Sequence, residues 1–229
     1  MISTRHLWTV LATLAASALT AQAQTSVIDE GTFRLSVRGT TVGTETFTIR
    51  RSGSGANATT VAQGRIVLET GQQTQAVLEL QGASLRPAAY QIEVRGDDRQ
   101  NITGRAAGNR FRATIVSSSG EQMREYLVSE NAVILDDGVA HQHYFVAAAA
   151  GSDARVPIIV PRQNRQVTAR VQSHGAETIQ VAGRQVQARR ITIQIPGTDT
   201  RTVWVDSQNR VLQLRIPDQD LLAERTALP

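Results

Sequence analysis

The sequence predicts a mainly β protein, built as one curved antiparallel sheet (a half-barrel or open barrel) with one short helix across its concave face. Two observations predict the sheet. Apolar residues recur at every second position in segment after segment, and clusters of Gly, Asp, Asn and Ser separate these segments at hairpin spacing. The helix is predicted because one stretch near the middle of the chain breaks the two-residue rhythm.

Residues 1–23 are typical of a cleavable secretory signal. Arg5 supplies a positive charge, a short apolar core follows, and Ala-Gln-Ala at its end offers small residues to the signal peptidase. We expect cleavage after Ala23, export to the periplasm, and a single β-rich domain over residues 24–229. The apolar core is shorter than the roughly 20 residues that span a bilayer, and no Cys is present to carry a lipid. We therefore expect no stable membrane anchor.

The alternation of apolar and polar residues is clearest in six segments. Arg, Ser, Thr, Gln and Glu occupy most of the intervening positions, as in an antiparallel sheet with one solvated face. The tripeptides 163–165 and 208–210 are both Gln-Asn-Arg and both precede an alternating segment, so we predict a hairpin turn at each. The apolar residues expected on the inner face are Phe33, Leu35, Val37, Ala76, Leu78, Leu80, Tyr90, Ile92, Val94, Phe111, Ala113, Ile115, Ile191, Ile193, Ile195, Leu212, Leu214 and Ile216.

The helix is predicted to begin after Asp137, a suitable N-cap, and to end at Gly151. Pro157 and Pro161 then indicate a loop or an edge strand. A division into two domains at the helix is the alternative to one domain, although no long linker separates the halves. The residues expected on the buried stripe of the helix are Val139, His143, Val146, Ala147 and Ala150.

The charge of the chain argues against nucleic-acid binding. The formal net charge is +4, and removal of Arg5 with the signal leaves 23 Arg against 20 acidic residues, a surplus of +3. The pI of about 10.5 is high because every one of these basic residues is Arg, so the small positive balance is not offset until the Tyr side chains ionise near pH 10. Aromatic residues make up only 4% of the chain, too few for a stacking platform.

His141-Gln142-His143 is the candidate metal site, with Asp136, Asp137 or His174 as further ligands. On the predicted helix, however, residues two apart point roughly 200° apart around the axis. The two imidazoles could not then bind one ion. We therefore expect no metal and no other cofactor, with one His partly buried and the other facing solvent.

No catalytic motif is present in the sequence. It lacks a Gly-x-Ser-x-Gly turn, a Cys-His arrangement and a His-Glu-x-x-His helix, and without Lys it contains no Walker-type phosphate loop. We expect a protein without catalytic activity. A periplasmic enzyme, most simply one that needs a metal, ranks third among the functions considered.

Trp204 lies in a segment with apolar residues on both faces, because Val203 and Val205 point the opposite way. Such a Trp is either a core residue of a central strand or part of the wall of a hydrophobic ligand cavity. The residues predicted to line that cavity are Trp204, Phe111, Tyr90, Tyr144 and Phe145.

Residues 31–49 and 203–217 carry the patterns Gly-x-Phe-x-Leu-x-Val-x-Gly-x-x-Val-Gly-x-Glu-x-Phe-x-Ile and Val-Trp-Val-Asp-x-x-x-Arg-Val-Leu-x-Leu-x-Ile-Pro. These patterns resemble exported bacterial domains of unknown function, whose layout is similar to that of the lipoprotein carriers LolA and LolB. The resemblance covers the two ends of the mature chain. It implies a curved sheet whose open side is plugged by helices, and no functional residue can be transferred from strand patterns.

The resulting hypothesis is a non-catalytic periplasmic protein that binds or carries a lipid or the acyl chain of a lipoprotein. The alternative is a scaffold or accessory subunit of the cell envelope, whose sheet edge or Arg-bearing face docks another protein.

Overall fold

The computed structural model describes residues 25–150 and 153–229, so the predicted signal and the predicted helix terminator Gly151 lie outside the described residues. The first eight strands are β1 (Thr25–Val37), β2 (Thr40–Ser52), β3 (Thr59–Leu68), β4 (Gln73–Gln81), β5 (Arg86–Arg95), β6 (Gln100–Ala107), β7 (Arg110–Ser117) and β8 (Gly120–Leu127). They are followed by β9 (Val133–Ile134), helix α1 (His143–Ala149), β10 (Asp153–Val160), β11 (Arg165–Val181), β12 (Arg184–Gln194), β13 (Arg201–Val205), β14 (Val211–Ile216) and β15 (Leu221–Arg225).

The strands form one sheet in the order β8-β7-β6-β5-β4-β3-β2-β1-β15-β14-β13-β12-β11-β10-β9. It contains two antiparallel meanders, β1–β8 and β10–β15, which are joined where β1 pairs with β15. The pairing is antiparallel, as predicted, except that the short β9 pairs in parallel with β10. The sheet therefore ends at β8 on one side and at β9 on the other.

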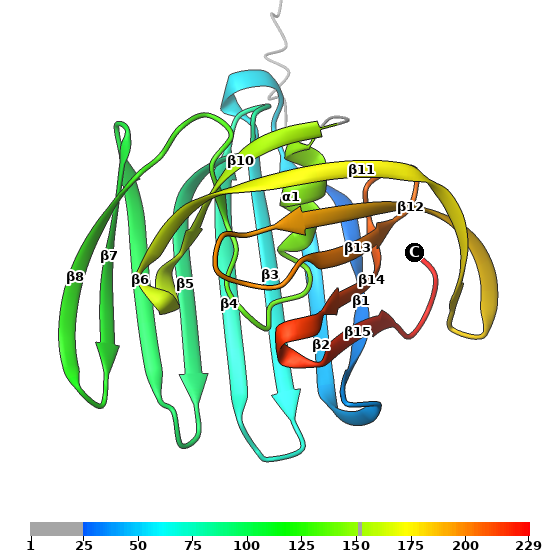
Figure 1. Ribbon diagram of the computed structural model, residues 1–229. Helices are drawn as coiled ribbons and strands as arrows, with labels where there is room; N and C mark the ends of the chain where they lie inside the picture. Colours follow the sequence, from blue (N-terminus) through cyan, green and yellow to red (C-terminus); the bar gives the residue numbers. More distant parts are fainter. Residues whose placement is uncertain (1–24, 151–152) are drawn as a thin grey trace, which may run out of the picture.

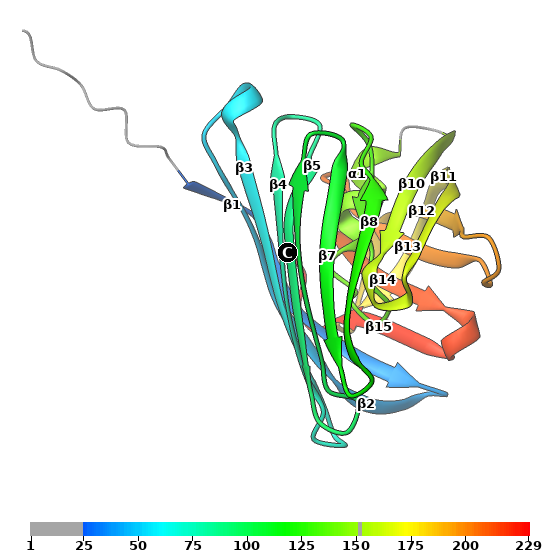
Figure 2. The same cartoon turned by 90° about the vertical axis from the view of Figure 1, so that its left-hand side faces the viewer.

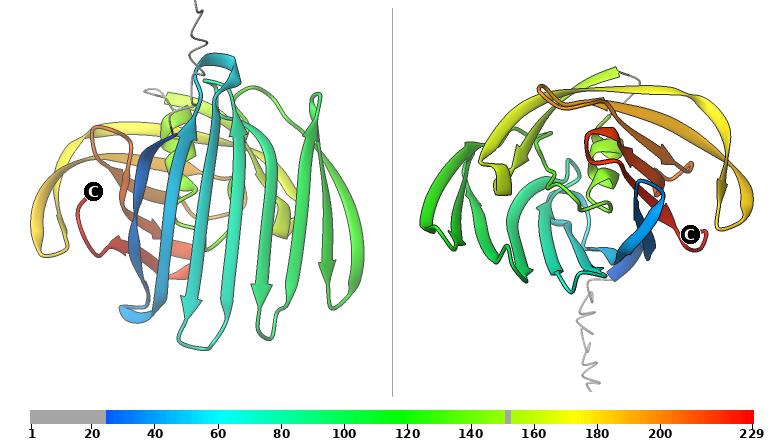
Figure 3. Two further views of the ribbon diagram at one scale, coloured as in Figure 1. Left: turned by 180° about the vertical axis from the view of Figure 1, so that it is seen from behind. Right: turned by 60° about the horizontal axis from the view of Figure 1, so that its bottom comes forward.

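The sheet curves into an open barrel. Figure 1 shows the strands β1–β5 behind α1, β8 at the left-hand side and the strands β10–β15 in front of α1. Figure 2 shows the same two walls from the side, and the right-hand view of Figure 3 shows α1 within the curve of the sheet. The predicted fold class is confirmed. In the described residues, no helix is long and apolar enough to cross a membrane.

The concave side of the sheet holds the hydrophobic core. The predicted inward residues are buried, except that Val37 is half-buried at its edge. Leu212 is buried in a second cluster, with Val181 and Ala188, instead of the main core. A register irregularity between Trp204 and Val205, where β13 pairs with β14, accompanies this change of side.

The helix is shorter than predicted, because it begins at His143 and not after Asp137. Gly138 has a φ of +73°, a left-handed conformation that an α-helix cannot contain. The N–H groups of His143, Tyr144 and Phe145 then bond to carbonyls three residues back, which marks a tight turn before α1. Asp137 is therefore not the N-cap, although the five residues of the predicted stripe are all buried.

Both predicted Gln-Asn-Arg turns are confirmed. Asn164 and Asn209 occupy left-handed positions, with φ of 49° and 63°, between β10 and β11 and between β13 and β14. Asn tolerates this conformation better than most residues, so the sequence repeat has a conformational cause. Pro157 lies within β10, which has a full neighbour only in β11, consistent with an edge position.

Candidate functional site

The segment that connects β8 to β10, residues 128–150, fills the concave side of the sheet, and we call it the plug segment. Its buried apolar residues include Ile134, Leu135, Val139, Phe145 and Val146. The same segment carries Asp136, His141, Gln142 and His143, all buried as well. Polar groups in such a place require partners, because leaving one unpaired costs about 1–3 kcal/mol.

Glu45 of β2 provides partners for the turn before α1. Its Oε2 accepts a hydrogen bond from the Ala140 N–H at 2.7 Å, and its Oε1 accepts from the His141 N–H at 3.0 Å. His141 also donates from Nδ1 to Oε1 at 2.6 Å, and both side chains are fully buried. One carboxylate therefore binds three N–H groups of the plug segment.

The imidazole of His141 fits against the sheet because β3 has no side chain at Gly64. A Cβ there would lie 2.5 Å from His141 Cε1, well inside van der Waals contact. On the neighbouring strand, the Phe47 ring stacks on the imidazole, with centroids 5.6 Å apart and an interplanar angle of 7°. Glu45, Phe47 and Gly64 together form a shaped seat for His141.

Tyr90 and Asp136 form a second attachment between sheet and plug. The Tyr90 hydroxyl donates to Asp136 Oδ2 at 2.6 Å, and the Gln142 side chain accepts from the Asp136 N–H at 2.7 Å. The Arg162 N–H donates to Asp136 Oδ1 at 3.3 Å. Burial raises the pKa of the Asp136 carboxyl, although the Arg162 charge and the Tyr90 hydrogen bond act to lower it. Burial, and secondarily the neighbouring Asp136, raises the pKa of the Tyr90 hydroxyl well above its usual value.

His143 is held at the start of α1. It donates from Nδ1 to the Ala140 carbonyl at 3.1 Å, and it is fully buried. Burial, and secondarily the Arg201 charge, lowers its pKa to about 3, so the imidazole is neutral. Arg201 in turn binds Asp137, with Nη2 2.5 Å from Oδ1. The expectation that one of the two His side chains faces solvent is wrong, because the plug segment runs inside the sheet.

The metal hypothesis gains no geometric support. Within residues 25–150 and 153–229, no group of three or more His, Cys, Asp or Glu side chains is placed to hold a metal ion. The Nε2 atoms of His141 and His143 have no hydrogen-bond partner among these residues. Asp136 and Asp137 are instead engaged with Tyr90, Arg162 and Arg201.

A pocket lies at one mouth of the barrel, with polar and apolar surface in equal parts, and we call it the mouth pocket. It has a volume of about 300 Å³ and lies between the β4–β5 turn, the loop after β8 and the second half of α1. The polar residues at its rim are Ser84, Glu130 and Asn131. Its apolar lining residues are Ala83, Leu85, Ala132, Val133, Phe145, Ala148 and Ala149.

The five predicted cavity residues do not surround one space. Phe145 lines the mouth pocket, whereas the Tyr90 hydroxyl is bonded to Asp136 and the Phe111 ring packs against Gly104 inside the sheet. Tyr144 is half-buried beside Phe145, with ring centroids 5.3 Å apart. Trp204 lies on the opposite face of β13 from the core, where it packs with the second cluster and donates from Nε1 to Glu177.

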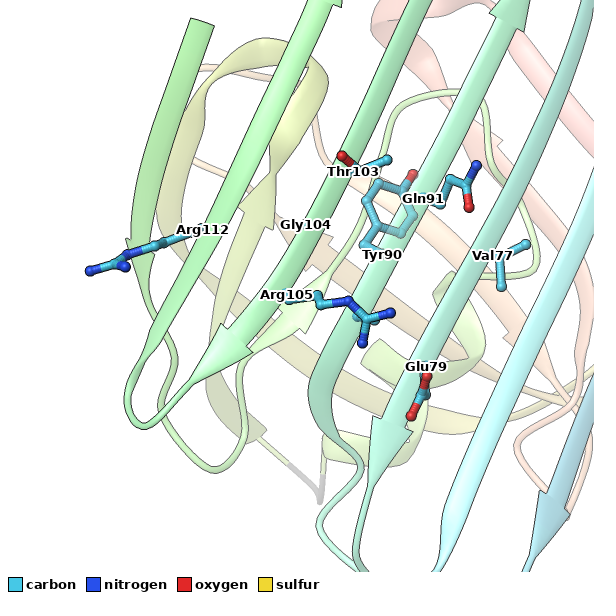
Figure 4. A pocket seen from close by; sticks show the side chains of 9 residues that line it. Val77, Glu79, Tyr90, Gln91, Thr103, Gly104, Arg105 and Arg112 are labelled. Atoms are coloured by element: carbon cyan, nitrogen blue, oxygen red, sulfur yellow. The ribbon is translucent and has the colours of Figure 1, made fainter.

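Two shallow depressions lie on the convex face of β2–β7. Figure 4 shows the larger, of about 430 Å³, with Glu79, Arg105 and Arg112 from three different strands around it. The second, of about 390 Å³, is lined by Thr, Gln and Arg side chains together with Phe47, Gly64, Ala76 and Val77. The first has polar and apolar surface in equal parts, whereas the second is mostly apolar.

Sequence reasoning missed Glu45, Asp136 and Gln142 as attachment points of the plug. Glu45 gave a usable signal, since it stands at an inward position of the alternation between Gly43 and Phe47. An acidic residue on the buried face needs a buried partner. The identity of that partner, 96 residues away, is not encoded in any local pattern.

Comparison with known proteins supports the fold. No family model and no curated protein matches the chain. The chain is similar to the crystal structure of a β-barrel-like protein of the domain of unknown function DUF1849 from Brucella abortus. The two share 10% sequence identity and a TM-score of 0.50 over 85% of this chain and 94% of that chain. This likeness shows a shared β-barrel-like architecture, and the layout of LolA and LolB stays a prediction.

Proposed function

We propose that this protein is a non-catalytic envelope protein that binds or carries an amphiphilic molecule, a lipid or a lipoprotein acyl chain, with the apolar chain in the mouth pocket. The signal predicted at residues 1–23 would deliver the protein to the periplasm, where such molecules are in transit. The observation that carries the proposal is the presence of Leu85, Val133 and Phe145 in the mouth pocket, where two loops and α1 meet beside a polar rim.

The composition of the mouth pocket suits an amphiphile. Seven of its ten lining residues are apolar, and Glu130 and Asn131 are exposed at its rim. An apolar chain would be desolvated among Leu85, Phe145 and Ala148, while Glu130 and Asn131 could bind hydroxyl or amine groups of the head. The volume of about 300 Å³ is at the lower end for small-molecule sites, which are typically about 300–1,000 Å³.

Leu85 supports a binding role through its backbone. Its φ of +54° lies in the left-handed region, which Gly or Asn usually occupies and where a Leu is uncommon. Strained backbone positions of this kind concentrate at ligand sites. Here the conformation belongs to the turn that places the Leu85 side chain in the mouth pocket.

The test is native mass spectrometry of the mature protein purified gently from the periplasm. We expect extra mass that disappears under denaturing conditions and is identified as lipid after organic extraction. Ala148→Trp should fill the mouth pocket and remove that mass, because Ala148 is exposed on the pocket side of α1. Ala107→Trp, an exposed position on β6, is the matched control and should keep it. Equal occupancy in both variants would contradict the proposal.

A further inference from the structure

The β8 edge is the long exposed end of the sheet. The opposite end, β9, has only two residues, and both are buried. β8 spans eight residues, of which only Tyr126 is buried. Such an edge presents unpaired backbone groups, and proteins usually protect it with Pro, charged side chains or a bulge. β8 contains no Pro, and its pairing with β7 runs without a register shift, so its charged residues Glu121, Arg124 and Glu125 are what separates it from a fully apolar edge.

The direction of the backbone groups in β8 follows from two flanking residues. The Val128 N–H bonds to the Asn109 carbonyl, on the side of β7. The backbone N–H and C=O of Leu127 point away from β7, because both bond to the Gln166 side chain. Backbone groups alternate along a strand, so Glu121, Met123 and Glu125 direct their N–H and C=O groups away from β7, as Leu127 does.

Gln166 shows what this edge binds. Its Oε1 accepts from the Leu127 N–H at 3.0 Å, and its Nε2 donates to the Leu127 carbonyl at 2.6 Å. These are the two hydrogen bonds that a backbone amide of an added strand would make. The Gln166 side chain thus takes the place of one residue of a neighbouring strand at Leu127. The outward backbone groups of Glu121, Met123 and Glu125 stay open to another molecule.

Large apolar side chains are exposed beside the β8 edge. Met123, Leu127 and Val116 are 76%, 54% and 45% exposed, and all three belong to β7 or β8. Met123 lies between Glu121 and Glu125 on the same face. Glu125 is bound by Arg110 and Arg112 at 2.8 and 2.7 Å.

We propose that residues Glu121–Glu125 of β8 form a strand-addition site for an extended segment of a partner protein. The segment would place an apolar side chain opposite Met123 and a basic one opposite Glu121, which cross-strand pairing favours. A second copy of this chain fits poorly. In the antiparallel pairing centred on Met123, each Glu121 would lie opposite a Glu125, and like charges there are destabilising.

The probe is an acetylated, amidated peptide, Thr-Arg-Thr-Val-Thr-Arg-Thr, whose Arg and Val side chains share one face. We expect saturable binding in a calorimetric titration, with new protection of the amides of Glu121, Met123 and Glu125 in hydrogen exchange. Arg124 Nη1, which donates to the Met123 carbonyl at 3.1 Å, would be displaced. The same peptide N-methylated on the bonding residues should not bind, since it lacks the donors.

Met123→Pro separates strand addition from other modes of binding. The N–H lost at Met123 faces solvent, so the melting temperature should stay close to wild type, while peptide affinity should fall about tenfold or more. Glu121→Arg should weaken binding of the Arg peptide and favour a peptide with Glu at the facing position. Exchanging the charges of residue 121 and of the facing peptide residue would then reverse which peptide the protein prefers.

Absence of saturable binding, or equal affinity for wild type and Met123→Pro, would overturn the proposal. Protection of Glu121, Met123 and Glu125 without peptide, in a protein that sediments as a dimer, would also overturn it and assign the edge to a second copy. Ala148→Trp should leave peptide affinity unchanged, so failure of the mouth-pocket proposal and failure of this one are distinguishable.

Discussion

Glu45 and His141 meet in the interior of the barrel, with Nδ1 of the imidazole 2.6 Å from Oε1 of the carboxylate, although 96 residues separate them in the chain. Neither side chain is exposed to solvent. The same carboxylate binds the N–H groups of Ala140 and His141. This pair therefore attaches the turn that begins α1 to the second strand of the sheet.

Glu45→Gln should destabilise the fold and loosen the plug segment. An amide offers one acceptor oxygen where the carboxylate offered two, so at least one of three buried donors loses its partner, at a cost of about 1–3 kcal/mol. Urea unfolding measures the loss, and hydrogen exchange should show faster exchange at Ala140 and His141. The exposed Glu69→Gln is the control. Equal stability of the two variants would show that Glu45 does not anchor the plug.

Gly64→Ala should lower stability by about 1–3 kcal/mol, the usual range for overpacking a core. The new methyl group would lie 2.5 Å from His141 Cε1 and push the imidazole from its seat. Gly175→Ala, in β11, is the matched control, since a Cβ there meets nothing within 4 Å and its φ is not positive. Thermal unfolding of both variants checks this prediction, and a similar melting temperature for the two would refute it.

His143 should make the protein less stable in acid. Its pKa is about 3 in the folded protein and 6.5 when unperturbed, so the unfolded chain binds a proton first as the pH falls. The contribution of neutral His143 to the free energy of unfolding should be fully present above pH 6.5. Below that pH it should decrease by about 1.4 kcal/mol per pH unit, until His143 protonates in the folded protein near pH 3.

The contribution of His143 is isolated by comparison with His143→Gln, which does not titrate. Urea unfolding at pH 4, 5, 6 and 7 should show a smaller acid loss in the variant. Asp29 and Asp136, whose pKa values are raised by burial, contribute with the opposite sign and are present in both proteins. Parallel pH profiles for wild type and variant would contradict the assignment.

Arg225 should be essential to the seam between the two meanders. It is buried in β15, binds Asp29 of β1, and lies 5.4 and 5.0 Å from the ring centroids of Phe33 and Phe47. Arg225→Met should cost about 3–5 kcal/mol because it leaves Asp29 buried without its cation.

The double variant Arg225→Met, Asp29→Asn should recover part of that loss, since it removes the unpaired charge together with its partner. Denaturant unfolding of the four proteins in the cycle measures the coupling. Additive effects of the two substitutions would mean that the pair makes no joint contribution.

The strands and their inward faces could be predicted from the sequence, because the two-residue alternation and the turn residues are local properties. Phe33, Leu78 and Ile193 are buried as that rhythm predicts, and Asn164 and Asn209 form the predicted left-handed turns.

Which side of a strand becomes the core, and what fills it, was decided by the tertiary structure. The strand around Trp204 is apolar on both faces, with Trp204 on one and Val203 and Val205 on the other. Only the curvature of the sheet placed Val203 inside and Trp204 outside. The start of α1 depended on Gly138 and on a carboxylate from β2, and the burial of both His141 and His143 depended on the path of the plug segment. Contacts between residues about a hundred positions apart obey no local period, so they become determined only when the chain closes on itself.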